Sequence, residues 1–434
     1  MRRLLVPLCV AAVAAVVWGA VFLLSPTGDQ EPVRQRLAVA PTRVSESVIT
    51  DASGEEIGKL SADCADDRYA AFCRRVHEEL SAVDPRLLTR GGLVVTTTMD
   101  GRAQEAAQRA IDARVRSSDG PVAAEAMVVP GTGEIRALAA SRGDGAHQLQ
   151  QGPTAMAYTL AAALANGLRY DDGFPHTLGY RASGYAAFKN CKDQAVGDPS
   201  FTITNPGSER RDGEFVTLRA GVREALNTFF MRLEEKAGLC ETVRTARRLG
   251  LARSGGVALS EYEAFTLGVN EVDLVSVANS YATLAARGTR CEPTAVKEVR
   301  DMSGKVLRAF APRCEQALDP AVADAVTGLL RTGGLGRDAA GLPGTTDGYA
   351  AAWYAGYTPA LAAAVNLGFP DDPMRHRLTD VTLAGHRHAS VEGTTIPLPI
   401  WRASMTEALR GTPESAFTRP DEERFGGCRL ACPK

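Results

Sequence analysis

The stretch from Gln151 to Gly167 constrains the fold most, because small and apolar residues dominate it. Pro153 stands where a helix could begin, since proline's fixed φ and missing N–H suit the first helical position. The alanines and leucines that follow predict a buried helix. Burying such a helix requires a large core, and a chain of 434 residues that is 45% hydrophobic is long enough to build one.

The N-terminus carries a candidate membrane segment. Met1-Arg2-Arg3 precedes 21 apolar residues, Leu4 to Leu24, and at about 1.5 Å per residue such a helix crosses a core of roughly 30 Å. Two arginines before the run and none within it predict that the N-terminus lies inside. A cleaved signal peptide is the alternative, but the run exceeds the usual h-region and no small-x-small site directly follows it. We therefore predict a signal anchor over residues 1–25, with the protein in the cell membrane as a single-pass protein and its bulk extracytoplasmic.

Charge and cysteine content narrow the classes of partner and cofactor. The net charge is −2, so no overall basic field indicates nucleic-acid binding. Eight cysteines follow Cys9, and an even number in an exported chain indicates disulfides, although eight cysteines allow 105 pairings. The cysteines form no C-x-x-C and are not interleaved with histidines at ligand spacing, so we predict no metal and no cofactor. Pairing of nearest neighbours predicts the bonds Cys64–Cys73, Cys191–Cys240, Cys291–Cys314 and Cys428–Cys432.

The remaining pattern alternates strands and helices. Hairpins are predicted around the Gly-containing turns at Ser53-Gly54, Gly131–Gly133 and Ser303-Gly304. Residues 167–215 lack periodicity and are expected to be irregular. A single helical run is expected from Val216 to Ala237. Further helices are predicted near 72–80, 104–115, 273–288, 321–330 and 397–409, and further strands near 91–99, 353–358 and 361–368.

Three segments of the chain resemble penicillin-binding transpeptidases. The nucleophile helix of that family reads P-G-S-T-F-K-P-F-T-L-A-A-A-L-x-x-G, and the shared run Thr159–Leu164 aligns Pro153 with its serine and Met156 with its lysine. The second motif, A-L-x-x-S-x-N-T-x-F, aligns Ala225 with its serine and keeps Asn227. The third, A-G-K-T-G-T-T, is matched by residues 340–346, which read A-G-L-P-G-T-T. The resemblance runs from about Phe72 to Phe417.

The resemblance implies an α+β fold of the β-lactamase/transpeptidase-like type, an antiparallel sheet flanked by helices and preceded by one transmembrane helix. It is closest in kind to class A, actinobacterial-type proteins, but the E-D-x-x-F signature of their glycosyltransferase domain is missing from the sequence. The implied domains are the anchor (1–25), a linker with a remnant hairpin (26–71), a transpeptidase-like domain (72–418) and a polar Cys-containing tail (419–434).

The catalytic motifs are missing in every register, not only at the aligned positions. None of the seven lysines stands three residues after a serine or is followed by Ser-Gly or Thr-Gly, and no serine stands two before an asparagine. A serine nucleophile needs a base about one helical turn away. We therefore predict no catalytic residue and a degenerate cleft at Pro153, Met156, Ala225, Asn227, Leu342, Pro343, Gly344 and Thr345.

The residues found instead favour packing over chemistry. Pro153 removes the hydroxyl and also the backbone N–H that serves the family as an oxyanion donor, a loss that typically costs about 10²–10³ in rate. Met156 fills a lysine-sized groove without a charge. Leu342 removes a cation that would meet a substrate carboxylate. Thr154 has no base placed to activate it.

We therefore expect a catalytically inactive pseudo-transpeptidase that acts in peptidoglycan synthesis as a scaffold or regulator. The expected partners are peptidoglycan or cell-wall synthesis proteins, and the membrane through the N-terminal helix. Two alternatives remain at this level. One is an active or penicillin-binding serine-type D,D-transpeptidase with a non-standard site. The other is a noncovalent sensor of peptidoglycan stem peptides that uses Asn227, Gly344 and Thr345.

Overall fold

The structure is a computed structural model that describes residues 46–60, 68–143, 145, 148–372 and 375–433. These residues belong to one compact unit, which spans 44–434. The predicted signal anchor at 1–25 and most of the predicted linker lie outside the described residues. Among the residues that are described, no helix is long and apolar enough to cross a membrane.

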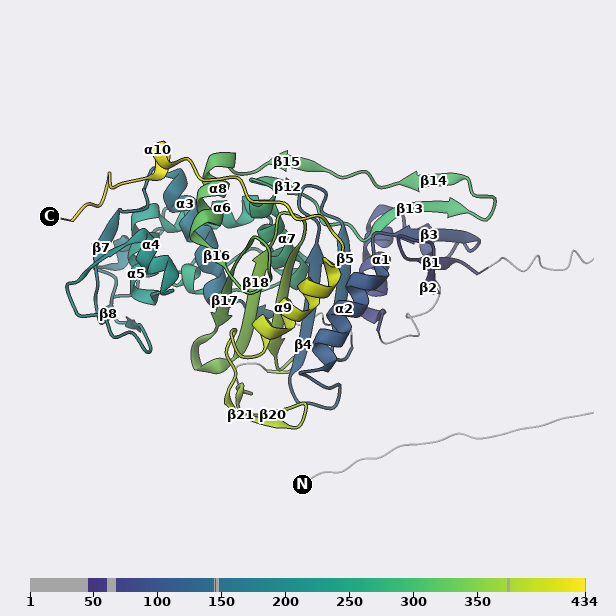
Figure 1. Ribbon diagram of the computed structural model, residues 1–434, viewed down its shortest axis with the longest axis horizontal. Coiled ribbons are helices and arrows are strands. Elements are labelled where there is room, and N and C mark those ends of the chain that lie inside the picture. The colour runs from purple at the N-terminus through teal and green to yellow at the C-terminus, as the bar shows by residue number, and fades with distance from the viewer. Residues whose placement is uncertain (1–45, 61–67, 144, 146–147, 373–374, 434) are drawn as a thin grey trace, which may run out of the picture. The chain divides into compact units, whose positions relative to one another are not determined.

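The centre of the unit is a six-stranded antiparallel sheet (Figure 1). Its central strands are rich in alanine, and every residue of β18, β19 and β4 is buried. Strands buried on both faces need cover on both sides. The strand order is β16 (Arg331–Thr332), β17 (Ala339–Thr345), β18 (Ala351–Tyr357), β19 (Ala362–Gly368), β4 (Val122–Val128) and β5 (Ile135–Ala140).

Helices cover both faces of this sheet. On one face lie α2 (Gly101–Asp112) and α9 (Pro397–Ala408), which pack against each other and against strands of the sheet. On the other face α7 (Leu274–Ala285) crosses β4, β18 and β19. The predicted α+β architecture, an antiparallel sheet flanked by helices, is therefore present.

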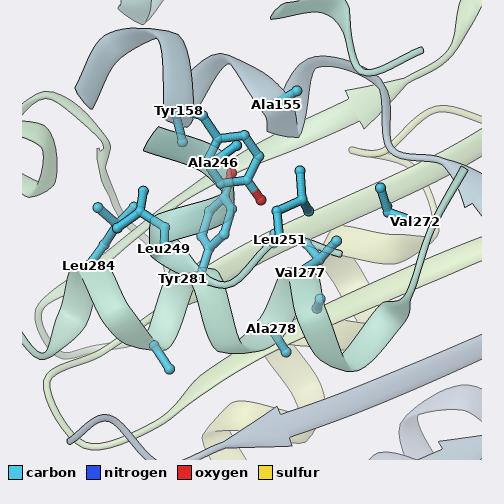
Figure 2. Close-up of a cluster of buried hydrophobic side chains, with 14 of the residues drawn as sticks. Ala155, Tyr158, Ala246, Leu249, Leu251, Val272, Val277, Ala278, Tyr281 and Leu284 are labelled. Atoms are coloured by element: carbon cyan, nitrogen blue, oxygen red, sulfur yellow. The ribbon is translucent and has the colours of Figure 1, made fainter. Parts of the chain in front are cut away.

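The predicted buried helix is the centre of a helical cluster beside the sheet. It begins as a 3₁₀ turn, η2 (Gly152–Ala155), and continues as α3 (Met156–Ala165). All of α3 from Met156 to Leu164 is buried, because it packs against α5, α6 and α8. Figure 2 shows Tyr158 of α3 beside Tyr281 of α7 in this core. The other helices of the cluster are α4 (Leu218–Arg223), α5 (Asn227–Ala237), α6 (Leu239–Leu249) and α8 (Pro320–Leu329).

The predicted single helix from Val216 to Ala237 is wrong. The chain forms α4 and α5 instead, with a break around Ala225, whose φ is +47°. Such a φ lies outside the right-handed helical region, so the helix cannot continue through it. Residues 167–215 are largely irregular, as expected, with the short elements β7 (Gly173–Pro175), β8 (Gly179–Tyr180), η3 (Tyr185–Ala187) and β9 (Ile203–Thr204), while β10 (Phe215–Thr217) pairs with β7.

A second sheet contains the predicted N-terminal hairpin. Strand β1 pairs parallel with β3, so the hairpin shares a sheet with strands from the region that resembles a transpeptidase. Helix α1 (Ala70–Val83) packs against β13 of this sheet and β5 of the first. The strand order is β14 (Val306–Ala309), β13 (Val296–Asp301), β3 (Leu93–Thr97), β1 (Val48–Thr50) and β2 (Glu56–Lys59).

The remaining elements are short and lie in the connections between the two sheets and the helical cluster. Four further pairs of strands are β8 with β9, β6 (Leu149–Gln150) with β11 (Glu271–Val272), β12 (Thr289–Cys291) with β15 (Cys314–Gln316), and β20 (Thr379–Leu383) with β21 (His386–Ser390). The single turns are η1 (Pro85–Leu88), η4 (Ser254–Gly256), η5 (Phe265–Leu267), η6 (Asp347–Tyr349) and the C-terminal α10 (Glu422–Phe425).

Disulfides follow the nearest-neighbour pairing wherever both partners are described. The bonds are Cys191–Cys240, Cys291–Cys314 and Cys428–Cys432. Cys291 and Cys314 are direct cross-strand partners on β12 and β15, so their bond closes the base of the β13–β14 arm. Cys73 is also disulfide-bonded, but its predicted partner Cys64 lies outside the described residues.

Candidate functional site: a closed transpeptidase-like cleft

The first-motif segment, residues 151–156, is held by hydrogen bonds to other buried groups of the protein. Pro153 lies in the first turn of η2. The hydroxyl of Thr154, fully buried, donates to the carbonyl oxygen of Gln151 at 3.0 Å. The hydroxyl of Tyr281 donates to the carbonyl oxygen of Thr154 at 2.8 Å. Thr154 therefore presents no free hydroxyl to a substrate.

Met156 has no exposed surface and belongs to the main hydrophobic core. Two residues further along, the hydroxyls of Tyr158 and Ser280 are hydrogen-bonded at 2.8 Å, which ties α3 to α7. Desolvation raises the pKa of Tyr158 above its usual value, so its hydroxyl stays protonated. The position that aligns with the family's lysine is thus a packing position.

The strand with the third-motif equivalents lies directly against this segment. A Cβ atom placed on Gly344 of β17 would lie only 2.3 Å from the carbonyl oxygen of Gln151. Conversely, a Cβ on Gly152 would lie 3.2 Å from backbone atoms of Thr345. The two backbones are in contact, so at this point no side chain, and no substrate chain, fits between them.

A third segment holds β17 from another direction. Gly393, in the loop after β21, approaches so closely that a Cβ there would lie 2.8 Å from the nitrogen of Gly344. The N–H of Gly393 donates to the hydroxyl of Thr345 at 3.0 Å. Thr345, a candidate ligand-binding residue, therefore already serves as an acceptor within the fold.

Leu342 and Pro343 occupy opposite faces of the same strand. Leu342 is buried in the main core, at 7% exposure. The N–H of Gly341 donates to the carbonyl oxygen of Leu330, and strand alternation places the nitrogen of Pro343 at that same edge. Proline is tolerated there because it removes no bond of the β17–β18 ladder.

The second-motif equivalents lie at the start of α5, which packs against α3. The side-chain amide of Asn227 donates to the carbonyl oxygen of Thr204 at 3.1 Å and so holds β9. The Asn205 side chain accepts the N–H of Thr228 at 2.9 Å, which satisfies a donor in the first turn of α5. Asn227 thus has a structural partner in this conformation.

Ala225 adopts a left-handed conformation that costs an L-residue roughly 1 kcal/mol. Replacing it with glycine should therefore stabilise the protein by about 0.5–1 kcal/mol. The matched control is Ala220→Gly inside α4, which should destabilise by a similar amount because that site is right-handed. Urea unfolding of both variants measures the two signs, and a destabilised Ala225→Gly protein would contradict the assigned strain.

The buried acid near this site makes a structural bond. Glu234 of α5 is fully buried, and its carboxyl accepts the N–H of Thr266 at 3.1 Å. Thr266 in turn accepts a hydrogen bond from Thr159 of α3 at 2.7 Å. Burial raises the pKa of Glu234 well above its usual value, which favours the neutral form of the carboxyl. The carboxyl already serves as an acceptor within the fold.

The structure brings together the first-motif and third-motif positions, while the second-motif residues are held by β9 and its loop. Sequence reasoning missed Gln151 and Gly393, the two residues whose backbones close onto Gly344. The glycine at 393 gave no usable signal, because its partner lies 49 residues away along the chain. Two surface pockets of the described residues lie elsewhere, beside the Cys191–Cys240 bond and between Asp319 and Arg424.

Comparison with known proteins identifies the family of this fold. No protein-family model matches the chain. It is 32% identical over 386 residues to penicillin-binding protein 1A of Mycobacterium tuberculosis, and 31% identical over 380 residues to penicillin-binding protein 1A of Mycolicibacterium smegmatis. These matches cover 79% of this chain in both cases, but 43% and 45% of the relatives. The chain therefore spans less than half the length of these two relatives.

Solved structures give the same result. The PonA1 protein of M. tuberculosis in complex with penicillin V matches with a TM-score of 0.67 and 26% identity, covering 85% of this chain and all of that chain. Penicillin-binding protein A of M. tuberculosis, as an imipenem acyl-enzyme, shares the fold with a TM-score of 0.64 and 19% identity, over 84% of this chain and 99% of that one. The chain is a homologue of the penicillin-binding proteins, with the mixed α+β fold of their transpeptidase domains.

Proposed function

We propose that the protein is a catalytically inactive, membrane-anchored homologue of the penicillin-binding proteins that acts in peptidoglycan synthesis as a scaffold or regulator. In this proposal residues 1–25 form the anchor, 26–71 the linker with its hairpin, 72–418 the transpeptidase-like domain and 419–434 the tail. The observation that carries it is the contact between the backbones of Gln151 and Gly344, which joins the segment aligned with the first motif to the strand aligned with the third.

The chemistry of the aligned positions supports the same function. An acyl transfer needs a nucleophile, a base and a stabilised oxyanion. Pro153 supplies neither a hydroxyl nor an N–H. Met156 and Leu342 are buried in the apolar core, where a lysine would need a partner for its charge. The partners in this proposal are other cell-wall synthesis proteins, reached through the surface of the domain.

Labelling with a fluorescent penicillin tests the proposal. The full-length protein in detergent should form no covalent adduct, by gel fluorescence and intact mass, while penicillin-binding protein 1A of M. tuberculosis is labelled in parallel. Loss of the nucleophile and of one oxyanion donor should slow acylation by at least about 10³-fold. A stoichiometric adduct would reject the proposal. Thr154→Ala then tells whether that adduct formed on the one hydroxyl in η2.

A second arm of this experiment separates a scaffold from a sensor of stem peptides. Calorimetric titration of a peptidoglycan stem peptide should give no saturable heat, because Thr345 and Asn227 already have partners within the fold. Saturable binding that Asn227→Ala and Thr345→Ala weaken would identify a noncovalent sensor. Binding without covalent labelling would leave the loss of catalysis intact and overturn the scaffold role alone.

A further inference from the structure

The C-terminal tail packs onto the domain and contributes to its core. Phe425 of α10 is 1% exposed, and its ring lies 6.0 Å from that of Tyr170, centroid to centroid. The guanidinium of Arg219 covers the ring of Tyr170 at 4.0 Å from its centroid. The tail thus closes over the chain that follows the C-terminus of α3.

Backbone hydrogen bonds attach the tail along an extended line. The N–H of Tyr170 donates to the carbonyl oxygen of Phe425 at 2.8 Å, and the N–H of Asp171 to that of Gly427 at 3.1 Å. The N–H of Gly173, in β7, donates to the carbonyl oxygen of Ala431 at 2.8 Å. Main-chain bonds of this kind are how an extended peptide binds an exposed strand edge.

The carboxylate of Asp172 is the centre of the attachment. One of its oxygens, Oδ1, accepts the N–H groups of Arg429, Leu430 and Ala431 at 2.9, 2.7 and 2.7 Å. Successive backbone N–H groups that converge in this way form an anion-binding nest. Asp172 itself is 1% exposed, so its charge depends on these donors for compensation.

The disulfide Cys428–Cys432 closes the loop that carries the three donors. Cys428 and Cys432 lie one residue before and one after them, so the bond restricts the backbone that must converge on Asp172. Constraining a loop in its bound conformation removes the entropic cost of ordering it. Cys432 is an exposed residue and Cys428 is half-buried, whereas Asp172 is buried, so the disulfide lies at the surface side of the attachment, where a reductant approaches it from solvent.

We propose that residues 421–432 form a redox-controlled latch, closed by the Cys428–Cys432 disulfide and opened when a dithiol reductant cleaves it. A thiolate of the dithiol attacks the sulfur of Cys432, and Cys428 leaves as a thiolate that takes up a proton. The second thiol of the reductant then displaces Cys432. Two electrons pass to the protein, the cysteines become thiols, and the reductant becomes a disulfide.

Opening the latch would uncover a defined surface. The N–H groups of residues 170, 171 and 173 would lose their partners in the tail. The ring of Tyr170, now 1% exposed, would lose its contact with Phe425, and Asp172 would keep the N–H of Arg169 at 2.7 Å but lose its three donors from the tail. The tail is also held by a hydrogen bond from the Arg169 guanidinium to the carbonyl oxygen of Gly426 at 3.2 Å. Two exposed ion pairs, Arg424 with Asp319 and Arg219 with Glu422, contribute little. The occupant of this surface is the chain's own tail.

Hydrogen exchange of the full-length protein tests the latch. Cys428→Ser/Cys432→Ser removes only this bond, and the amides of residues 429–431 should then exchange at least about tenfold faster. Asp172→Asn should give the same increase with the disulfide intact, since a neutral amide accepts more weakly from three N–H groups. In the unmodified protein, incubation with a dithiol should reproduce the effect, together with faster tryptic cleavage after Arg424 and Arg429.

The matched control is Cys291→Ser/Cys314→Ser, which removes a disulfide at the base of the β13–β14 arm and should leave amides 429–431 unchanged. Amides of β18 and β19 report whether each variant is folded. Unchanged protection of residues 429–431 in folded Cys428→Ser/Cys432→Ser would overturn the latch. So would an equal loss of tail protection in the Cys291→Ser/Cys314→Ser control.

Discussion

Met156→Lys is expected to destabilise the protein by about 3–5 kcal/mol at pH 7, the cost of an uncompensated buried charge. Met156 has no exposed surface and lies in the main hydrophobic core. Burial raises the pKa of Glu234 on the neighbouring helix α5, so ionising this carboxyl to provide a counter-ion would carry a further cost. The substitution recreates the family's lysine at a site that no longer accommodates it.

The pH dependence of the stability of Met156→Lys tests whether the buried lysine charge causes the destabilisation. Burial lowers the pKa of a lysine in the folded state, while the unfolded chain keeps a value of about 10.4. Between these two values the unfolded state binds more protons, so stability rises with pH. The penalty relative to the parent protein should therefore shrink as pH rises from 7 towards 10, measured by urea unfolding at each pH.

Met156→Leu is the matched control, because it keeps the volume and adds no charge. It should cost less than about 1.5 kcal/mol and show no change with pH relative to the parent. If Met156→Lys were as stable as Met156→Leu, the position would face solvent or an acidic partner. The closed cleft would then be the wrong description of this site.

Local pattern was sufficient to predict the elements that are buried by their own composition. Pro153 and the alanines after it predicted a buried helix, and α3 is buried from Met156 to Leu164. The Gly-containing turns predicted the hairpins, since such turns need conformations that few other residues adopt. The absence of the S-x-x-K, S-x-N and K-T-G motifs was also readable from the sequence, because a missing serine or lysine requires no three-dimensional information.

The features that the sequence did not predict depend on contacts between segments that are far apart along the chain. The helix expected through Ala225 breaks there, although alanine is the best helix former, and the two helices that result have different neighbours: α4 packs against β10 and α8, and α5 against α3 and α6. The packing of β17 against the first-motif segment depends on Gly344 meeting Gln151 and Gly393. The sequence predicted only a polar tail and not its attachment to Asp172. That attachment uses backbone N–H groups, which every residue except proline has, so the side-chain pattern does not indicate it.

Glu125→Gln is expected to stabilise the protein above pH 8 by a few kcal/mol. Glu125 is fully buried in β4, where desolvation raises the pKa of its carboxyl from 4.5 to about 8. The hydroxyl of Ser404 donates to its Oε1 at 2.6 Å, the bond that partly offsets this cost. Glutamine keeps the shape and an oxygen acceptor for Ser404, but it never ionises.

The direction of this pH effect on stability follows from the number of protons that the folded and unfolded states bind. Between pH 4.5 and 8 the folded protein keeps the Glu125 proton that the unfolded chain has released. Stability therefore falls with rising pH, by up to about 1.4 kcal/mol per pH unit from this group. Glu125→Gln removes that slope, so the two proteins should be nearly equal near pH 5 and diverge up to about pH 8.

Exposed Glu105 of α2 supplies the control, since it forms only an i,i+4 pair with Arg109. Glu105→Gln should change stability by less than about 0.5 kcal/mol at any pH in this range. Other buried acids, including Glu234, titrate equally in the parent and in both variants, so their contributions cancel in the differences. Parallel stability profiles for Glu125→Gln and the parent would show that Glu125 is ionised in the fold. The charge would then have to be compensated by a group other than Ser404, or by water entering beside β4.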